Sequence, residues 1–154
     1  MNFILILLNL STPSSFAAKE PPKVFVDKGA CPFECCTYRE WTVLEDTKIF
    51  DAIDGKVLLE TVKKGAKVTG LTGEVHTTPL QIKDKDGKAI YLLTYLGEGF
   101  WKTWVDGAVK ENGEVNSNNL VTPQSTWWVK IKLQNGKIGW TKETNHFGNK
   151  DSCA

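Results

Sequence analysis

The chain has 154 residues and a formal net charge of +1, with 41% hydrophobic residues and six tryptophans. This length suits one modest domain, and the nearly balanced charge argues against a nucleic-acid-binding protein, which would carry a basic stripe or a strongly positive domain. The lysines alternate with apolar residues along the expected strands, so we interpret them as the solvated faces of sheets and expect no nucleic-acid partner.

Residues 1–17 are typical of a secretory signal peptide. The apolar run from Phe3 to Leu10 is too short to cross a bilayer as a helix. Ser15 and Ala17 then supply the small residues of a cleavage site. We therefore expect a secreted or periplasmic protein that has no membrane contact after cleavage and is a monomer.

Residues 18–40 form a leader that carries a cysteine cluster. An even number of cysteines in a small exported chain indicates two disulfides. Adjacent cysteines rarely bond to each other, so either Cys35 or Cys36 is expected to bond to Cys31, and the other to Cys153. The long bond would close a loop of over a hundred residues, worth about 4 to 5 kcal/mol in the chain-entropy model. Paired CxxC motifs are absent, which disfavours a zinc site or a redox site. The cysteines are Cys31, Cys35, Cys36 and Cys153.

Short alternating runs between glycine turns follow the leader. Strands are expected at Thr47 to Phe50 and Val57 to Val62 around Asp54-Gly55, and at Lys67 to Leu71 after Gly65. No amphipathic run of helical period exceeds about three turns. The sequence therefore predicts an all-β domain over residues 41–154.

The segment from about residue 74 to about residue 125 is expected to form a β-meander of its own. Asp86-Gly87 and Asp106-Gly107 each fit a two-residue hairpin turn. Those turns would place Ile82 opposite Tyr91, and Trp104 opposite Val109. The strands expected here are 88–96, 100–105 and 108–115, followed by a polar loop over 116–125.

A hairpin is expected near the C-terminal end. Val129, Ile131 and Leu133 alternate with lysines, and Asn135-Gly136 fits a two-residue type I′ turn. That register places Leu133 opposite Ile138, and Ile131 opposite Trp140, with all four side chains on one face. Trp128 would point to the opposite face, and we expect the meander to cover it.

Two segments together resemble the bacterial SH3-like (SH3b) domain family. They are VKKGAKVTGLTG, residues 62–73, and WVKIKLQNGKIGW, residues 128–140. The resemblance implies an SH3-like β-barrel with a long insertion, which extends the first sheet or forms a second, packed SH3-like half. It also implies a non-enzymatic module of the bacterial cell envelope that binds peptidoglycan or an extended peptide of a partner protein. The positions that match the family pattern are Gly65, Trp128, Asn135, Gly136, Gly139 and Trp140.

Aromatic residues are dense between positions 95 and 140. Aromatic rings with polar neighbours suit sugars and peptides, because the ring faces stack while amides and hydroxyls fix the orientation. Trp104 and Trp140 are expected in the core, whereas Trp101 and Trp127 fit either the core or a binding platform. The candidate ligand-binding residues are Tyr95, Trp101, Trp127 and Trp128.

The sequence offers little support for catalysis. His76 and His146 are the only histidines, and no serine or free cysteine lies in a nucleophile motif. Phosphate-loop and metal motifs are absent, so we expect no enzyme activity, cofactor or metal. The alternative is a purely structural or inhibitory secreted domain with every aromatic in the core. An envelope hydrolase would require a buried acid or an activated thiol.

Overall fold

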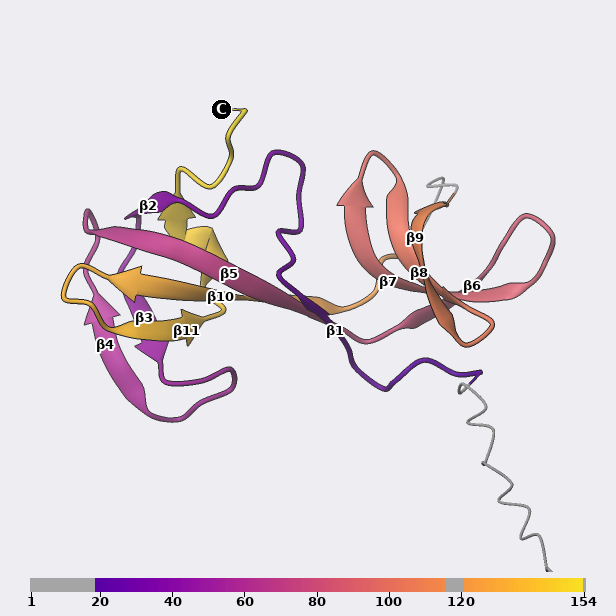
Figure 1. Ribbon diagram of the computed structural model, residues 1–154, viewed down its shortest axis with the longest axis horizontal. Coiled ribbons are helices and arrows are strands. Elements are labelled where there is room, and N and C mark those ends of the chain that lie inside the picture. The colour runs from indigo at the N-terminus through magenta and orange to yellow at the C-terminus, as the bar shows by residue number, and fades with distance from the viewer. Residues whose placement is uncertain (1–18, 116–120, 154) are drawn as a thin grey trace, which may run out of the picture.

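The computed structural model describes residues 19–153 except 116–120, so the predicted signal peptide lies outside the described residues. The chain is all-β, as predicted, and its strands form two antiparallel sheets (Figure 1). The larger sheet curls into a half-barrel, and the smaller one lies beyond the end of its longest strands. Within the described part, no helix is long and apolar enough to cross a membrane.

The larger sheet has the strand order β12-β2-β5-β10-β11-β3-β4, and β1 also pairs with β5. The β1 and β2 strands pair with different parts of β5, and β10 pairs along nearly its whole length. A 3₁₀ helix, η1 (Thr144–His146), precedes the last strand. The strands are β1 (Phe25–Lys28), β2 (Glu40–Val43), β3 (Thr47–Phe50), β4 (Leu58–Val62), β5 (Lys67–Thr77), β10 (Ser125–Leu133), β11 (Ile138–Thr141) and β12 (Phe147–Gly148).

The smaller sheet is the predicted meander, with the order β6-β7-β8-β9. The insert therefore forms a sheet of its own and does not extend the larger one. Its strands are β6 (Leu80–Lys83), β7 (Ala89–Gly97), β8 (Phe100–Val105) and β9 (Ala108–Glu114).

The core of the half-barrel is built by alternating side chains of its strands. Trp41 on β2 is fully buried and lies against β5 at Gly70, where a Cβ atom would come within 2.8 Å of the indole. Only glycine permits this close approach. The other buried members of this cluster are Val43, Ile49, Val62, Val68, Val129, Ile131, Leu133 and Phe147.

A β-bulge lets β5 continue beyond the barrel. The pairing of β5 with β10 shifts between Lys130 and Ile131, which leaves Leu71 as an extra residue. The extra residue changes which positions face inward, from Val68 before the bulge to Val75 and Thr77 after it. The buried face of the β5–β10 ribbon therefore extends toward the meander.

One of the three predicted two-residue turns is confirmed. Asp106 and Gly107 both have positive φ, at 52° and 84°, and Trp104 pairs with Val109. Positive φ at both central residues is what a type I′ turn requires.

The predicted register of the C-terminal hairpin is wrong by one residue. Leu133 N donates to Lys137 O at 2.8 Å, so three residues form the loop and Lys132 pairs with Ile138. Only Gly136 of the loop has positive φ, and Asn135 Oδ1 accepts a hydrogen bond from Lys137 N. A one-residue shift moves Ile138 and Trp140 to the outer face, instead of the predicted inner one.

The same difference occurs at the β6–β7 turn. Asp84 N donates to Lys88 O, and Ile82 pairs with Ile90 instead of the predicted Tyr91. Asp84 Oδ1 accepts hydrogen bonds from Asp86 N and Lys88 N, which stabilises the three-residue loop. Side-chain bonds to the backbone thus select the longer loop at both sites.

The prediction that the meander covers Trp128 is wrong, although the residue is buried. The meander lies beyond the ribbon's end and not over the β10–β11 hairpin (Figure 1). Trp128 is nevertheless only 5% exposed, and Lys142 Nζ lies 5.6 Å from its ring centroid. The aliphatic stem of a lysine can cover an aromatic ring while its amine stays hydrated.

Two disulfides join the leader to itself and to the C-terminal end. Cys31 bonds to Cys36, and Cys35 bonds to Cys153, which confirms the predicted arrangement and resolves the choice it left open. The leader also contributes the strand β1, which was not predicted from the sequence.

Candidate binding cleft between the two sheets

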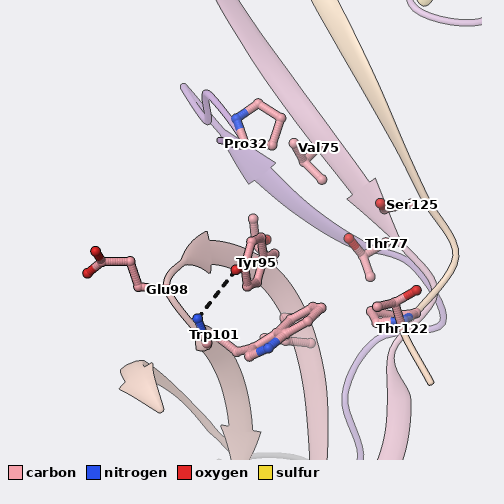
Figure 2. Close-up of a pocket in the computed structure, with 12 residues that line it drawn as sticks. Pro32, Val75, Thr77, Tyr95, Glu98, Trp101, Thr122 and Ser125 are labelled. Atoms are coloured by element: carbon pink, nitrogen blue, oxygen red, sulfur yellow. Dashed lines mark hydrogen bonds between the residues drawn. The ribbon is translucent and has the colours of Figure 1, made fainter. Parts of the chain in front are cut away.

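A cleft of about 630 Å³ lies where the end of the β5–β10 ribbon meets the meander (Figure 2). Its lining combines aromatic, aliphatic and hydroxyl groups. The lining residues are Pro32, Val75, Thr77, Leu93, Thr94, Tyr95, Glu98, Gly99, Trp101, Thr122, Pro123 and Ser125.

One wall comes from the larger sheet. Val75 and Thr77 occupy alternate positions of β5 beyond the bulge, so both side chains are on the same face. Ser125 pairs with Thr77 across the β5–β10 ladder and therefore shares that face. Pro32, from the cysteine cluster, completes this wall.

The opposite wall comes from β7 and β8. Tyr95 pairs with Trp101, and their ring centroids lie 5.0 Å apart at an interplanar angle of 57°. Trp101 is 5% exposed and Tyr95 is 41% exposed. The Tyr95 hydroxyl accepts a hydrogen bond from Gly99 N at 3.3 Å, which ties the ring to the β7–β8 turn (Figure 2).

Two threonine hydroxyls in the cleft lack hydrogen-bond partners. Thr77 is fully buried and Thr94 is 3% exposed. Within the described part of the chain, neither Oγ1 atom has a hydrogen-bond partner. An unsatisfied buried polar group costs about 1 to 3 kcal/mol, so such groups are rare and call for an explanation. Both oxygens are shielded from solvent in the free protein, so a ligand that displaces the side chains covering them and bonds to both hydroxyls would supply one.

Among the lining residues that the structure describes, no ionised side chain points into the cleft. Glu98 is the one acidic or basic residue of the lining, and its carboxylate points away from the other labelled residues (Figure 2). A charged ligand group would lose hydration here without gaining an opposite charge. The cleft therefore suits a neutral segment with apolar parts and hydrogen-bonding groups.

The leader fastens the meander close to the cleft. Lys102 Nζ lies 2.9 Å from Oδ1 of Asp27, which is 7% exposed. Burial alone would lower the pKa of Lys102, but the hydrogen bond and charge of Asp27 raise it above its usual value. Trp104 Nε1 donates to Lys19 O at 2.9 Å on the same stretch of the leader.

The structure brings two of the four predicted ligand-binding residues together. Tyr95 and Trp101 line the cleft. Trp127 instead packs against the barrel core, 6.3 Å from the Trp41 ring and 5.9 Å from Phe33. Trp128 lies under Lys142.

Trp127 belongs to a hydrogen-bonded aromatic cluster. Its Nε1 donates to the Tyr38 hydroxyl at 3.2 Å, and that hydroxyl donates to Ala30 O. Burial raises the pKa of Tyr38, and the bond from Trp127 opposes this change. Both partners also approach Gly73 so closely that a Cβ atom there would lie 2.2 Å from the Tyr38 hydroxyl oxygen. The cluster is therefore tightly packed and holds the leader against the β5–β10 ribbon.

The two tryptophans that were predicted to lie in the core, Trp104 and Trp140, are not fully buried. Trp104 is half-buried beside the leader, and Trp140 is half-buried on the outer face, 5.6 Å from Lys130 Nζ. The outer position of Trp140 follows from the shifted hairpin register.

The threonines were missed by the sequence analysis. Thr77 lies two residues after Val75, and Thr94 follows the apolar pair Leu92-Leu93. A hydroxyl in a run of buried positions is a signal for an unsatisfied polar group. The bulge at Leu71 hides this signal in β5, because it changes the alternation midway.

A group of potential metal ligands lies at the C-terminal disulfide. Ligand atoms of Cys35, Asp151 and Cys153 lie within 4.8 Å of one another. The two sulfurs are bonded together, and Asp151 Oδ1 accepts a hydrogen bond from Cys153 N. A cysteine binds a metal as a free thiolate, and both sulfurs here form a disulfide. This group therefore suits a structural bond and not a metal site.

Comparisons of the chain with protein-family models, curated proteins and solved structures find no match. A function must therefore be inferred from the chemistry of the cleft. The SH3b resemblance stays a hypothesis.

Proposed function

We propose that this chain is an exported, non-enzymatic binding module of the bacterial cell envelope. Its cleft would hold a neutral, extended segment of peptidoglycan or of a partner protein. The observation that carries the proposal is the pair of unpartnered hydroxyls, Thr77 and Thr94, beside the aromatic pair Tyr95 and Trp101. Ligand sites typically combine apolar walls with a few converging polar groups in this way.

An SH3-like barrel is part of this proposal. The curled sheet is compatible with it, and glycines of the family-like pattern have local reasons to be glycine. Gly65 has a φ of +88°, and a Cβ atom on Gly139 would lie 2.5 Å from Phe50 O. The cell-envelope assignment depends on this resemblance.

Two disulfides support export. Such bonds persist in oxidising compartments and are rare in the cytosol. A secreted or periplasmic location is therefore the natural setting for the protein.

The contents of the cleft favour binding over catalysis. Among the described lining residues, only Tyr95 and Glu98 can titrate, and the Glu98 carboxylate is turned away. Hydrolysis by a carboxylate pair would need two acids across the bound ligand. The structural or inhibitory alternative would place every aromatic in the core, whereas Tyr95 is 41% exposed in the cleft.

Co-sedimentation with purified cell-wall sacculi and binding to immobilised peptides test the proposal. We compare the wild type with Tyr95→Ala and with Phe100→Ala, since Phe100 is 37% exposed in the same meander but outside the cleft. We expect wild type and Phe100→Ala to bind one of the probes and Tyr95→Ala to lose binding. No binding to either probe, or equal binding by Tyr95→Ala, would refute it.

A further inference from the structure

The second half of β7 has a free strand edge. The β6 strand pairs with β7 only up to the Leu80–Leu92 pair, whereas β7 continues to Gly97 and pairs with β8 on its other side. Within the described residues, positions 93–97 therefore have no strand neighbour on the β6 side. A free edge presents backbone N–H and C=O groups that can pair with another chain.

This free edge belongs to the cleft. Leu93, Thr94 and Tyr95 are cleft-lining residues of β7. The C-terminal half of β7 is on the side of the meander that faces β5 and the leader (Figure 1). The unpaired edge, the unpartnered hydroxyls and the aromatic pair are thus parts of one site.

We propose that the cleft binds an extended peptide, which adds as a strand to the free edge of β7 at residues 93–97. This inference rests on the proposed binding function and narrows its ligand to a polypeptide. A strand edge recognises a backbone with regularly spaced donors and acceptors, which an extended peptide provides and a glycan chain does not. Of the five edge residues, Tyr95 and Leu96 are 41% and 36% exposed, whereas Leu93, Thr94 and Gly97 are buried, so the accessible part of the edge is centred on Tyr95 and Leu96.

The walls of the cleft then select the side chains. Successive side chains of an added strand point to opposite faces, so alternate ones would face the wall that carries Val75 and Thr77. Residues with small apolar or hydroxyl side chains could pack there and bond to the hydroxyls of Thr77 and Thr94. Charged side chains would be excluded from these positions, because no counter-charge points inward.

The irregular pairing of β7 would limit what can add to it. Its register with β8 shifts between Leu92 and Tyr95 and again between Tyr95 and Gly97. Bulges twist an edge and protect it against open-ended pairing with other sheets. Addition of one short peptide, and not polymerisation of the protein, is the expected outcome.

A phage library of random decapeptides, panned against the full exported chain with both disulfides intact, tests the inference. The tightest binder is then resynthesised with single backbone N-methyl groups at each position. N-methylation removes one N–H donor and leaves the side chain unchanged. We expect about tenfold or greater losses of affinity at alternate positions and small effects in between, as one lost ladder bond implies.

The alternation serves as an internal control, because each N-methyl group that lowers the affinity is flanked by N-methyl groups that leave the affinity nearly unchanged. Failure to enrich any peptide, or losses without alternation, would overturn strand addition. Glycan strands freed of peptide provide the second arm, monitored by the NMR signals of the Thr77 and Thr94 methyl groups. If only glycan shifts these signals, the cleft is a binding site but the peptide inference is wrong. If neither probe shifts them, the proposed function fails as well.

Discussion

Lys102 of β8 and Asp27 of β1 form an ion pair across the junction of the two sheets, with Nζ 2.9 Å from Oδ1. Asp27 pairs with Val75, and Lys102 follows Trp101, so each partner adjoins a residue that lines the cleft. The ion pair therefore joins the two walls of the cleft close to the proposed ligand site.

Removal of the carboxylate should loosen this junction. We expect Asp27→Asn to lower the free energy of unfolding by about 1 to 2 kcal/mol, because among the described residues Lys102 then keeps only the weaker, more exposed partner Glu111 at 3.6 Å. Glu111→Gln is the control and should change it by less than about 0.5 kcal/mol. Urea unfolding measures both variants, and equal effects would contradict this role for Asp27.

Alkaline pH should weaken the same contact. The pKa of Lys102 is raised above 10.5 in the folded protein, so its stabilising contribution is complete below that value and is lost as pH rises through the folded pKa. Burial raises the pKa of Tyr38, so the contribution of this residue to stability is also lost as the pH rises. The wild type should thus lose more stability than Asp27→Asn as the pH rises above about 10.5, the ordinary pKa of a lysine. Parallel losses in the two proteins would show that Lys102 is not coupled to Asp27.

The two disulfides should contribute unequally. Cys35–Cys153 spans 118 residues and Cys31–Cys36 spans five. The chain-entropy model gives about 5 kcal/mol for the first and about 2 kcal/mol for the second. We therefore expect the Cys35→Ala/Cys153→Ala double variant to unfold at a clearly lower urea concentration than Cys31→Ala/Cys36→Ala. The reverse order would show that the local bond holds the leader.

The approach of Tyr38 to β5 should be sensitive to a single methyl group. Gly73→Ala would place Cβ 2.2 Å from the Tyr38 hydroxyl oxygen, so we expect a loss of about 3 kcal/mol. Gly29→Ala is the control, with open space around it but a φ of +76°, and should cost about 1 kcal/mol. Adding Tyr38→Phe should recover part of the Gly73→Ala loss in thermal unfolding. No recovery would place the clash elsewhere.

Much of the fold could be predicted from the sequence. Alternation and glycine turns predicted the all-β class and the separate meander, and cysteine spacing predicted the disulfide pattern. Register was harder, because the same turn residues can close a hairpin with a two-residue or a three-residue loop, and the two loops shift the strand pairing by one residue. Asp106 adopts positive φ and gives the predicted turn, whereas hydrogen bonds that Asp84 Oδ1 and Asn135 Oδ1 accept from backbone N–H groups favour the longer loop.

The site was predicted only in part. Aromatic density led to Tyr95 and Trp101, but the same criterion also selected Trp127 and Trp128, which pack elsewhere. The sequence could not separate them, because the cleft is formed by segments far apart in the chain. Thr77 and Thr94 become informative only once their burial is known.

Replacing the two hydroxyls should have opposite effects on stability and binding. Thr77→Val and Thr94→Val keep the shape of the side chain and remove an unpartnered buried oxygen, so we expect each to raise the free energy of unfolding by about 1 kcal/mol. The same changes should weaken binding of a peptide selected on the wild-type protein by about tenfold. Thr103→Val is the control, since Thr103 is buried in the meander outside the cleft. Destabilisation by the cleft variants would show that the hydroxyls are bonded within the free protein.

We propose that the junction of the two sheets is a ligand site. The most direct test is an NMR titration of the labelled protein with a selected peptide and with solubilised peptidoglycan fragments, followed at the Thr77 and Thr94 methyl groups and the Trp101 indole. Saturable shifts at these three residues, with little change at the Trp127 indole in the barrel cluster, are the predicted result. Shifts centred on Trp127, or none at the junction with either ligand, would show that the junction is not the ligand site.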